Sequence, residues 1–390
     1  MFVSYSISFG WFWAERNTIY FIDIVTDSML RLVEEHCKNF ANRNSDTGSS
    51  EPSALVELSK GVRSSYAARP SLSGPQGTRQ FTLEELQQAT KHFSESNLIG
   101  AGSFGLVYKG LLCDGIIVAI KRRPGAPGQH FVEEVCRLSD IRHRHLVTLL
   151  GCCQEDGLQM LLFEYLPNGT VCNHLYDKGE VSRTQLEFKQ RLSIALGAAK
   201  GICHLHGLSP PLAHRDFKTS NVLVDENFIA KVADAGISSL LERIEDASSS
   251  SRMTVNNVYR DPEIGELGTP AEMSDVYSFG VFLLELITGR EAQHLDLSES
   301  DESLTQWVEL HAGSKELVDR RLGNTFTTKG MDSFIKLMQQ CLSLTGRKRP
   351  KMGVIVRELD RILENEMTLT TVMGDGTATV TLGSQLFTST

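Results

Sequence analysis

The sequence lacks any sign of a cysteine-based scaffold or of a nucleic-acid-binding surface. Its eight cysteines form no CxxC pair, and several of them lie inside apolar runs. This pattern favours reduced, buried thiols in an intracellular protein over a disulfide scaffold. The formal net charge is −9 at pH 7 and no basic stripe dominates, so we expect no nucleic-acid partner.

The amino-terminal region also lacks the features of a spanning or secretory segment. The opening MFVSYSISFGWFWAERNTIYFIDIV is apolar and aromatic, but Glu15 and Asp23 interrupt it before the ~18–20 residues that a spanning helix needs. It has no cationic start for a secretory signal and no glycine at position 2 for myristoylation. We expect residues 1–40 to be a leader of unknown role without a spanning helix. Trp11 and Trp13 fit either a membrane interface or a poorly packed segment.

Composition divides the rest of the chain into an ordered core and two flanking segments. Hydrophobic residues make up 41% and charged residues 22%, which fits a globular protein with a proper core. Residues 41–80 are rich in Ser, Gly and Pro, so we expect a disordered linker. Ordered sequence begins near FTLEELQQATKHF, whose apolar residues recur at helical spacing. Residues 367–390 form a Thr-rich tail in which Asp375-Gly376 suits a hairpin turn, and we find no function for it.

The order of the periodicities predicts an α+β protein. Between 97 and 122, the segment LVYKGLL, the turn Cys113-Asp114-Gly115 and the segment IIVAIK predict a β-hairpin. Helical periodicity returns at HFVEEVCRLSDI and dominates from about residue 190. Strands first and helices after predict a small β-rich lobe followed by a larger α-helical lobe. The helix SDVYSFGVFLLELITG is apolar on nearly every face, so we place it in a core, ended by Gly289.

A glycine-rich loop at the start of the strands indicates a nucleotide site. Gly100, Gly102 and Gly105 satisfy G-x-G-x-x-G, a pattern shared by the dinucleotide-binding βαβ unit and the kinase glycine loop. The dinucleotide unit requires a helix at the third glycine, whereas a strand follows here, which makes that alternative weak. Glycines let the backbone approach phosphates, and Phe104 at the tip could close the site from water.

Lys121 and Glu134 are expected to form an ion pair beside that loop. A lysine that ends a strand is usually a surface residue. The following helix, however, carries Glu134 within its inward apolar stripe, while Glu133 faces outward and can pair with Arg137. An inward carboxylate is unfavourable unless a cation meets it. Lys121 is the natural partner, and the pair would aim the ammonium at the α- and β-phosphates of a nucleotide.

The segment HRDFKTSN gathers groups suited to phosphoryl transfer. Asp216 can accept or orient the proton of a substrate hydroxyl, and Lys218 can offset charge on the transferring phosphate. Asn221 and Asp234, the latter in KVADAGIS, offer hard oxygen ligands to Mg²⁺. Each of these residues alone is most simply a solvated turn residue. The whole set in this order predicts a nucleotide-dependent transfer.

These motifs carry a resemblance to the protein kinases, and more closely to the plant receptor-like kinases related to Pelle. GAGSFGLVYKG, VAIK, HRDFKTSN, SDVYSFGV and RKRP stand in the kinase order over about residues 95–365. The resemblance implies the bilobal α+β protein-kinase fold for residues 81–366, with an N-lobe at about 95–166 and a C-lobe at about 167–366. It also implies ATP and Mg²⁺ as cofactors.

The same resemblance implies an adenine site. Phe163 looks like the gatekeeper, and Glu164 to Leu166 would bind adenine through backbone groups. The residues that would enclose the base are Val107, Ala119 and Leu223.

Further roles follow from the resemblance. Lys218, two places after Asp216, is similar to the Ser/Thr kinases rather than the tyrosine kinases. Asp275 looks like the aspartate that anchors the catalytic loop from a buried helix. Glu263 and Arg349 look like the ion pair that ties the activation segment to the lower lobe.

Two positions depart from the family pattern. Ala235 stands where the family has a phenylalanine packed between the histidine of HRD, here His214, and the inward helix, here Leu138. Losing a packed phenyl ring typically costs about 3–5 kcal/mol where the site cannot collapse. Asp234 itself is intact, so we expect the chemistry to survive with a less firmly held active alignment. At positions 255 and 256, Val-Asn stands where the family usually has Gly-Thr. This change lies where the resemblance places the docking of a peptide substrate, so the usual docking is in doubt.

A serine run between these positions has two interpretations. A phosphate on Ser248–Ser251 or on Thr254 could pair with Arg215, which precedes the catalytic aspartate, and so order the segment. The run could equally be a flexible connection.

The sequence therefore predicts ATP- and Mg²⁺-dependent phosphoryl transfer to Ser/Thr hydroxyls of protein substrates in receptor-linked signalling. The alternative is a pseudokinase or nucleotide-binding docking module, with weak or no transfer because of Ala235 and the altered activation segment. We expect a cytoplasmic protein, either free or at the inner face of the plasma membrane, where a membrane receptor kinase would be its partner.

Overall fold

The computed structural model describes residues 78–125, 129–176, 186–244, 257–263, 271–295, 304–314, 316–323 and 325–369. The chain divides into two units, and among the described residues the first comprises only Leu111–Ile116. It is a hairpin tip in which Ile116 N donates to Asp114 Oδ1 at 3.1 Å, as the turn sequence predicts. All other described residues belong to the second unit.

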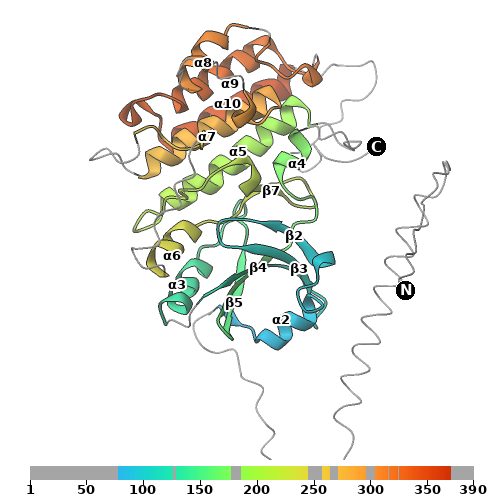
Figure 1. Ribbon diagram of the computed structural model, residues 1–390. Coiled ribbons are helices and arrows are strands. Elements are labelled where there is room, and N and C mark those ends of the chain that lie inside the picture. Colours follow the sequence, from blue (N-terminus) through green and yellow to red (C-terminus); the bar gives the residue numbers. More distant parts are fainter. Residues whose placement is uncertain are drawn as a thin grey trace, which may run out of the picture. The chain divides into compact units, whose positions relative to one another are not determined.

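The amino-terminal part of this unit is a β-sheet. Within the described residues it has six strands in the order β1-β5-β6-β4-β3-β2 (Figure 1). They are β1 (Arg79–Gln80), β2 (Leu98–Ala101), β3 (Leu106–Leu111), β4 (Ile117–Pro124), β5 (Leu149–Glu155) and β6 (Leu158–Glu164). The predicted hairpin is confirmed, because β3 and β4 are neighbours in the sheet. A short 3₁₀ helix, η1 (Glu95–Asn97), leads into β2.

Strand β1 (Arg79–Gln80) lies inside the segment that we expected to be linker up to residue 80, so ordered structure begins earlier than expected. Arg79 pairs in parallel with Gly151 of β5. Glycine is required there, because a Cβ on Gly151 would lie 2.1 Å from the carbonyl oxygen of Arg79. Helix α2 (Leu83–Ala89) follows, started by a capping box between Thr82 and Glu85. Residues 1–77, with the leader and most of the expected linker, lie outside the described residues.

Helix α3 (Gln129–Ser139) covers the sheet beside β5, and the remaining helices build the C-lobe (Figure 1). These are α4 (Val171–Leu175), α5 (Phe188–His206), α6 (Ile237–Ile244), α7 (Ala271–Thr288), α8 (Leu304–His311), α9 (Thr328–Cys341) and α10 (Met352–Leu369). The shorter elements are η2 (Thr219–Asn221), the strand pair β7 (Val222–Val224) and β8 (Ala230–Val232), η4 (Ala292–His294), η5 (Arg320–Leu322) and η6 (Gly346–Lys348). The predicted α+β arrangement, strands first and helices after, is thereby confirmed.

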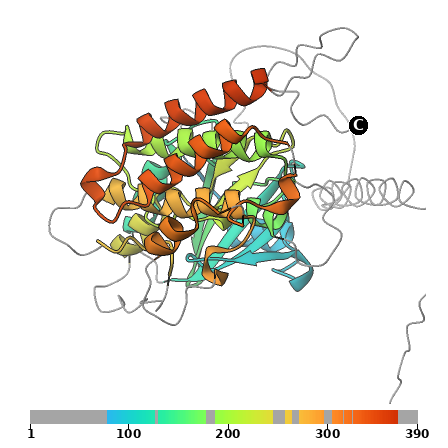
Figure 2. The same cartoon turned by 90° about the horizontal axis from the view of Figure 1, so that it is seen from above.

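Helix α7 forms the centre of the C-lobe. From Asp275 to Thr288 nearly every side chain is buried, which confirms the prediction of a core helix, and it ends before Gly289. Each fully buried Leu or Phe contributes about 1.5–3 kcal/mol. Helix α10 packs along α5 and α9, seen clearly in Figure 2. It runs to Leu369, so the last helix extends past the domain end that we expected at 366.

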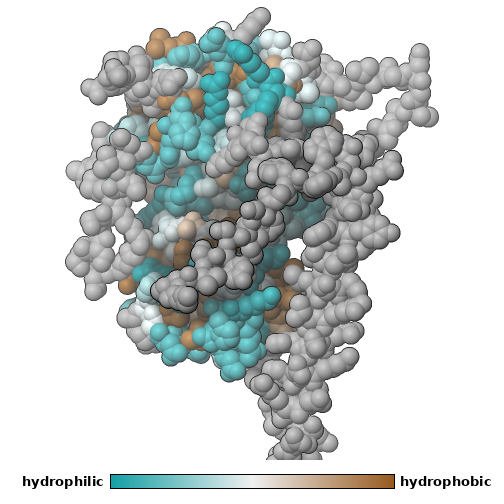
Figure 3. Space-filling model, turned by 45° about the vertical axis from the view of Figure 1, so that its right-hand side comes forward, coloured by the Kyte–Doolittle hydropathy of each residue, from teal (hydrophilic) through white to brown (hydrophobic). Residues whose placement is uncertain are grey.

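The surface of the described residues is more polar than this core. Figure 3 shows a described surface that is largely hydrophilic on the face in view. None of the described helices combines the length and the apolarity needed to cross a bilayer. Among the described cysteines none forms a disulfide, and burial raises the pKa of Cys152 to about 11 and that of Cys153 to about 12. Cys152 and Cys153 are therefore inert, buried thiols as the sequence predicts, whereas Cys113 is exposed, contrary to that prediction.

Candidate active site

The predicted catalytic residues form one cluster in the loop that precedes β7. Lys218 Nζ lies 2.9 and 3.1 Å from the two carboxylate oxygens of Asp216. Asn221 Nδ2 donates to the backbone carbonyl of Asp216 at 2.7 Å, which closes the loop on itself. The side chain of Asp216 keeps 25% of its surface exposed, so a substrate hydroxyl can reach it.

Asp275 of α7 holds this loop from below. Its carboxylate is 1% exposed and accepts from the backbone N–H groups of His214 at 2.7 Å and Arg215 at 2.8 Å. His206 Nε2 lies 2.8 Å from the same carboxylate. Arg215 has a φ of 65°, a left-handed conformation that side chains seldom adopt and that these bonds hold in place. The predicted anchoring role of Asp275 is confirmed.

Asn221 and Asp234 come from two loops that the β7–β8 pairing joins. The backbone N–H of Ala233 donates to the carbonyl oxygen of Asn221 at 2.8 Å, immediately before Asp234. Asp234 also has a φ of 65°, and its side chain is only 5% exposed. The structure thus brings together the two residues that the sequence predicts as magnesium ligands.

Lys121 of β4 meets Asp234 directly. Its ammonium binds the Asp234 carboxylate, and it lies 5.8 Å from the ring centroid of Phe163. A Cβ on Gly102 would lie 4.0 Å from the same ammonium, so the glycine loop runs close above it. The loop tip is closed by Gly102 N donating to Gly105 O at 2.9 Å and Gly105 N donating to Gly102 O at 3.1 Å. Lys121 therefore lies under the glycine loop, as predicted.

The prediction of an ion pair between Lys121 and Glu134 is wrong, because the two side chains have other partners in this structure. The Glu134 carboxylate is 14% exposed, as an inward position requires, but its partners are Arg137 and Arg243. Arg243 Nη1 of α6 lies 2.5 Å from Glu134 Oε1. Arg137 also binds Glu134 rather than Glu133, its expected partner. An inward carboxylate pairs with the cation that reaches it, and α6 brings Arg243 closer than β4 brings Lys121.

Helix α6 explains this rearrangement. Its apolar residues Ile237, Leu240 and Leu241 follow helical spacing and are buried in the same hydrophobic cluster as Phe104 and Phe131 of the N-lobe. Phe104, expected at the tip of the glycine loop as a cover over the site, is 2% exposed within this cluster.

The polar side of α6 adds further anchors. Glu242 binds Arg215, the residue before Asp216, while the neighbouring Arg243 binds Glu134. Sequence reasoning missed both partners, although the amphipathic pattern ISSLLERI after the aspartate was a usable signal.

The residues around Ala235 lie close to the inward helix. Ala235 is partly buried against the core of the C-lobe. The next residue, Gly236, has a φ of 78°, and a Cβ there would lie 2.3 Å from Cδ2 of Leu138. Ile237, two positions on, supplies the buried apolar side chain next to the cluster that Leu138 joins. Leu138 and Ile237 thus lie close to the position that lacks the phenyl ring, and the positive φ of Gly236 favours glycine there.

The expected adenine site lies along β3, β4 and the end of β6. Ala119 pairs in register with Phe163, and Val107 pairs with Gly100. Leu223 lies on β7 and forms a bridge with Thr170, and Leu166 is buried. These positions fit the implied roles, which stay predictions.

Glu164 has a structural role at the same place. Its carboxylate accepts from Thr148 N at 2.7 Å and from Lys231 Nζ at 2.8 Å. Burial alone would raise the pKa of Glu164, but these hydrogen bonds outweigh it and hold the pKa below its usual value. The side chain is therefore committed to holding the end of β6, which leaves its backbone for a ligand.

A second buried carboxylate was not predicted. Glu285 of α7 is 2% exposed and binds the hydroxyls of Thr219, Tyr259 and Tyr176, the last at 2.5 Å. Burial and the charge of Glu285 raise the pKa of Tyr259 well above its usual value, so its proton stays in the hydrogen bond. Glu285 thereby links the catalytic loop to the segment before Asp261. Its place in an otherwise apolar core helix was a usable signal, because a carboxylate buried there needs hydrogen-bond partners.

The expected pair of Glu263 with Arg349 is corrected. Arg349 forms two bonds with Asp261, from Nη1 at 2.6 Å and from Nη2 at 2.7 Å. Glu263 instead accepts from Gly346 N at 2.6 Å. The bidentate fork of arginine takes the buried carboxylate, and the segment is still tied to the lower lobe. Positions 245–256, with the serine run and Asn256, lie outside the described residues.

The residues present fit a magnesium–nucleotide complex better than a metal held by protein alone. In the described part of the chain, no three His, Cys, Asp or Glu side chains are arranged to hold a metal ion. Asn221 and Asp234 offer two oxygen ligands, and Mg²⁺ commonly takes one or two carboxylates together with phosphates and water. Asp234 is bound by Lys121 here, so the ammonium and a cation would compete for the same carboxylate.

Comparison with known proteins places the chain in a family. Residues 93–359 match the family described as "Protein tyrosine and serine/threonine kinase". The chain is 41% identical over 295 residues to the Proline-rich receptor-like protein kinase PERK13 of Arabidopsis thaliana, covering 73% of this chain and 41% of that protein. It is 38% identical over 327 residues to the Receptor-like protein kinase THESEUS 1 of the same plant, covering 82% and 38%. The chain thus spans less than half the length of these relatives.

A solved structure gives the same result. The pseudokinase domain of BIR2, described as an immune regulator of the RLK/Pelle family, matches with a TM-score of 0.61 and 30% identity. The match covers 73% of this chain and 86% of that one. Motif order, fold and these likenesses agree, and the chain belongs to the protein kinases, within the RLK/Pelle family of receptor-like kinases.

Proposed function

We propose that this chain transfers the γ-phosphoryl group of ATP to serine and threonine hydroxyls of protein substrates, with Mg²⁺ as cofactor. The observation that carries the proposal is the joined cluster of Asp216, Lys218 and Asn221, linked through Ala233 to Asp234 and from there to Lys121. Phosphoryl transfer depends mainly on positioning and charge neutralisation, and this cluster supplies groups for both.

Each residue has a distinct task in the proposed reaction. Asp216 accepts the proton of the substrate hydroxyl as its oxygen attacks, and Lys218, bound to Asp216, offsets the charge that develops on the transferred group. Asn221 holds the loop through the Asp216 carbonyl and, with Asp234, provides the oxygen ligands. When bound, ATP supplies the phosphoryl group and Mg²⁺ neutralises its oxygens. Lys218, two places after Asp216, supports Ser/Thr rather than Tyr as the acceptor.

We further propose that the arrangement described above is an inactive one. Lys121 is held by Asp234, and Glu134 is held by Arg243, so neither end of the expected Lys121–Glu134 pair is free. Departure of α6 would release Glu134 from Arg243 and Arg215 from Glu242. The serine run that follows α6 in sequence is a candidate for the phosphorylation that drives this change.

A pseudokinase is the second candidate. The observations that favour it are the short side chain of Ala235, the lysine bound to the metal-ligand candidate, and the likeness to the pseudokinase domain of BIR2. In that case the chain would bind nucleotide or a protein partner and signal through its conformation.

One pair of measurements separates the two candidates. Radiolabelled ATP with a generic basic protein should give labelled phosphoserine and phosphothreonine without phosphotyrosine, and labelled phosphotyrosine would refute the acceptor assignment. A Mg²⁺-dependent rise in melting temperature with ATP but no labelled product would favour the pseudokinase. Neither label nor shift would refute both.

The proposed setting is receptor-linked signalling. PERK13 and THESEUS 1 are receptor-like kinases by name, which supports a membrane receptor kinase as partner and a position at the inner face of the plasma membrane. Imaging of a tagged chain would test this placement, and uniform nuclear fluorescence would refute it.

A further inference from the structure

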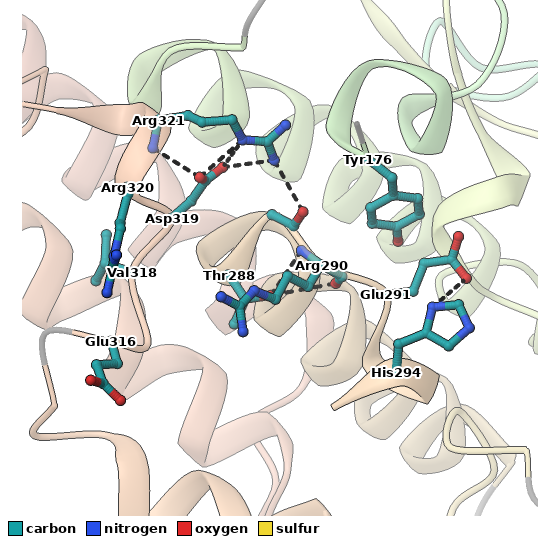
Figure 4. A pocket seen from close by; sticks show the side chains of 11 residues that line it. Tyr176, Thr288, Arg290, Glu291, His294, Glu316, Val318, Asp319, Arg320 and Arg321 are labelled. Atoms are coloured by element: carbon teal, nitrogen blue, oxygen red, sulfur yellow. Dashed lines mark hydrogen bonds and ion pairs between the residues drawn. The ribbon is translucent and has the colours of Figure 1, made fainter. Parts of the chain in front are cut away.

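A polar cavity of about 710 Å³ lies in the C-lobe, apart from the catalytic cluster (Figure 4). Its walls come from the end of α4, the end of α7 with η4, and the segment that leads into η5. Three guanidinium groups, those of Arg290, Arg320 and Arg321, line it from two of these walls. Its volume falls in the range of ligand sites, roughly 300–1,000 Å³.

On one wall, two guanidinium groups share a single carboxylate, and one of them, that of Arg321, lines the cavity. Asp319 receives Arg191 Nη2 at 2.6 Å and Arg321 Nε at 3.0 Å, so two cations share one carboxylate. Burial alone would raise the pKa of Asp319, but the hydrogen bonds from the two arginines outweigh it and keep the carboxyl ionised. Arg321 also donates to the carbonyl oxygens of Leu175 at 2.6 Å and Gly289 at 3.0 Å, which fixes its guanidinium between three elements.

Arg290 and Arg320 add two cations that this network does not use. Within the described residues neither guanidinium takes part in an ion pair, and both side chains are exposed. Figure 4 shows the Arg290 side chain extending across the cavity toward the wall that carries Arg320. Besides Asp319, two further acids line the cavity: Glu291, which lies 3.5 Å from His294, and Glu316.

A smaller cavity of about 190 Å³ continues from the first and shares Arg290, His294 and Glu316 with it. It is walled by Trp307 and His311, whose rings stack with centroids 4.2 Å apart. An aromatic wall of this kind binds a side chain by stacking or apolar contact. A ligand that fills both cavities therefore carries an anionic group for the arginines and, next to it, a side chain that can stack on Trp307 and His311.

We propose that this double cavity binds a phosphorylated peptide segment, with the phosphate between Arg290 and Arg320 and a neighbouring side chain against Trp307. Guanidinium groups form short, paired hydrogen bonds with phosphate oxygens, which is why arginine predominates in phosphate recognition. The continuation toward Trp307 favours a peptide over free phosphate or a lipid headgroup, neither of which carries a flanking side chain. The site does not depend on transfer activity.

Binding is tested with the full chain and a fluorescein-labelled phosphoserine peptide pool, Ala-Ala-phosphoSer-X-Ala-Ala, where X is any amino acid. Its unphosphorylated twin is the first control. We expect fluorescence anisotropy to show binding of the phosphorylated pool and at least about tenfold weaker binding of its twin, as charge-assisted hydrogen bonds require. Arg290→Ala with Arg320→Ala should weaken binding at least about tenfold, whereas Arg347→Ala, an exposed arginine of the same lobe, should not. Glu316→Gln removes a like charge and should tighten binding.

Several outcomes would overturn the proposal. They are equal binding of the two pools, unchanged binding by the double arginine variant while its melting temperature matches wild type, and displacement of the peptide by Mg²⁺ with ATP. Vesicles that contain phosphatidylinositol phosphates provide the last control. Binding of these vesicles without binding of the peptide pool would assign the cavity to a lipid instead.

Discussion

Replacing Arg243 tests whether α6 keeps Glu134 away from Lys121 and so restrains the proposed transfer. In the variant Arg243→Ala, Glu134 loses its partner on α6 and can turn toward Lys121. The Arg243 side chain is 51% exposed and that of Glu134 14%, so solvent screens the pair and its contribution is about 0.2–1 kcal/mol. If the restrained form predominates, the active population and the initial transfer rate should rise about 1.4- to 5-fold.

The control and the second readout make this prediction specific. Arg361 and Glu358 form an ion pair on α10 whose arginine is similarly exposed, at 48%, and whose acid is more exposed, at 34%. Arg361→Ala therefore removes an arginine–glutamate pair far from the site in sequence. The assay measures initial rates of label transfer to a basic protein, beside the melting-temperature shift caused by Mg²⁺ with ATP. Both quantities should rise in Arg243→Ala relative to Arg361→Ala. If the two variants give the same rate and the same shift, α6 does not restrain Glu134 and the reasoning fails.

Three other predictions follow from the same contacts. Lys121→Met should abolish transfer but leave the protein folded. Its melting temperature should fall without Mg²⁺, because the buried Asp234 loses its cation, and should rise again when Mg²⁺ is added. Insoluble protein would contradict this prediction. Ala235→Phe should lower the free energy of unfolding by about 1–3 kcal/mol, because Leu138 and Ile237 lie close to this segment and a phenyl ring would displace them; an unchanged melting temperature and rate would show that room remains. His145, 8% exposed, has a pKa lowered to about 4, first by burial, so the folded chain keeps it neutral while the unfolded chain protonates near pH 6.5. The neutral His145 therefore contributes to stability above pH 6.5, and this contribution is lost as the pH falls toward 4. Urea unfolding should show the free energy of unfolding falling by roughly 3 kcal/mol over this range. If His145→Gln shows the same pH dependence as wild type, the assignment to His145 is refuted.

The features that the sequence predicts well are those encoded locally. The hairpin around Asp114-Gly115 and the core helix α7 follow from periodicity and turn chemistry within about 20 residues. The cluster of Asp216, Lys218 and Asn221 lies within one loop, so its members were certain to be near one another. Asp275 was placed correctly only through the resemblance, because its partner amides are about 60 residues away in the chain.

The predictions that were wrong concern contacts between segments that are distant in the sequence. Glu134 was correctly predicted to face inward, but Arg243, 109 positions later, competes successfully with Lys121 for it. Similarly, β1 forms only because Gly151 admits the Arg79 carbonyl. In Asp-Pro-Glu at 261–263 the sequence offers two carboxylates to Arg349, and only the packing of the lower lobe selects Asp261. Pattern shows that a charge needs a partner, whereas three-dimensional proximity decides which partner it takes.

The most direct test of the account concerns Asp216. Wild type and Asp216→Asn should be compared for initial rates of label incorporation at saturating ATP and Mg²⁺, with circular dichroism to confirm matched folds. Because Asp216 is proposed to take the substrate proton, the rate should fall by at least about a hundredfold. Equal incorporation by the two proteins would contradict the proposed transfer by this cluster.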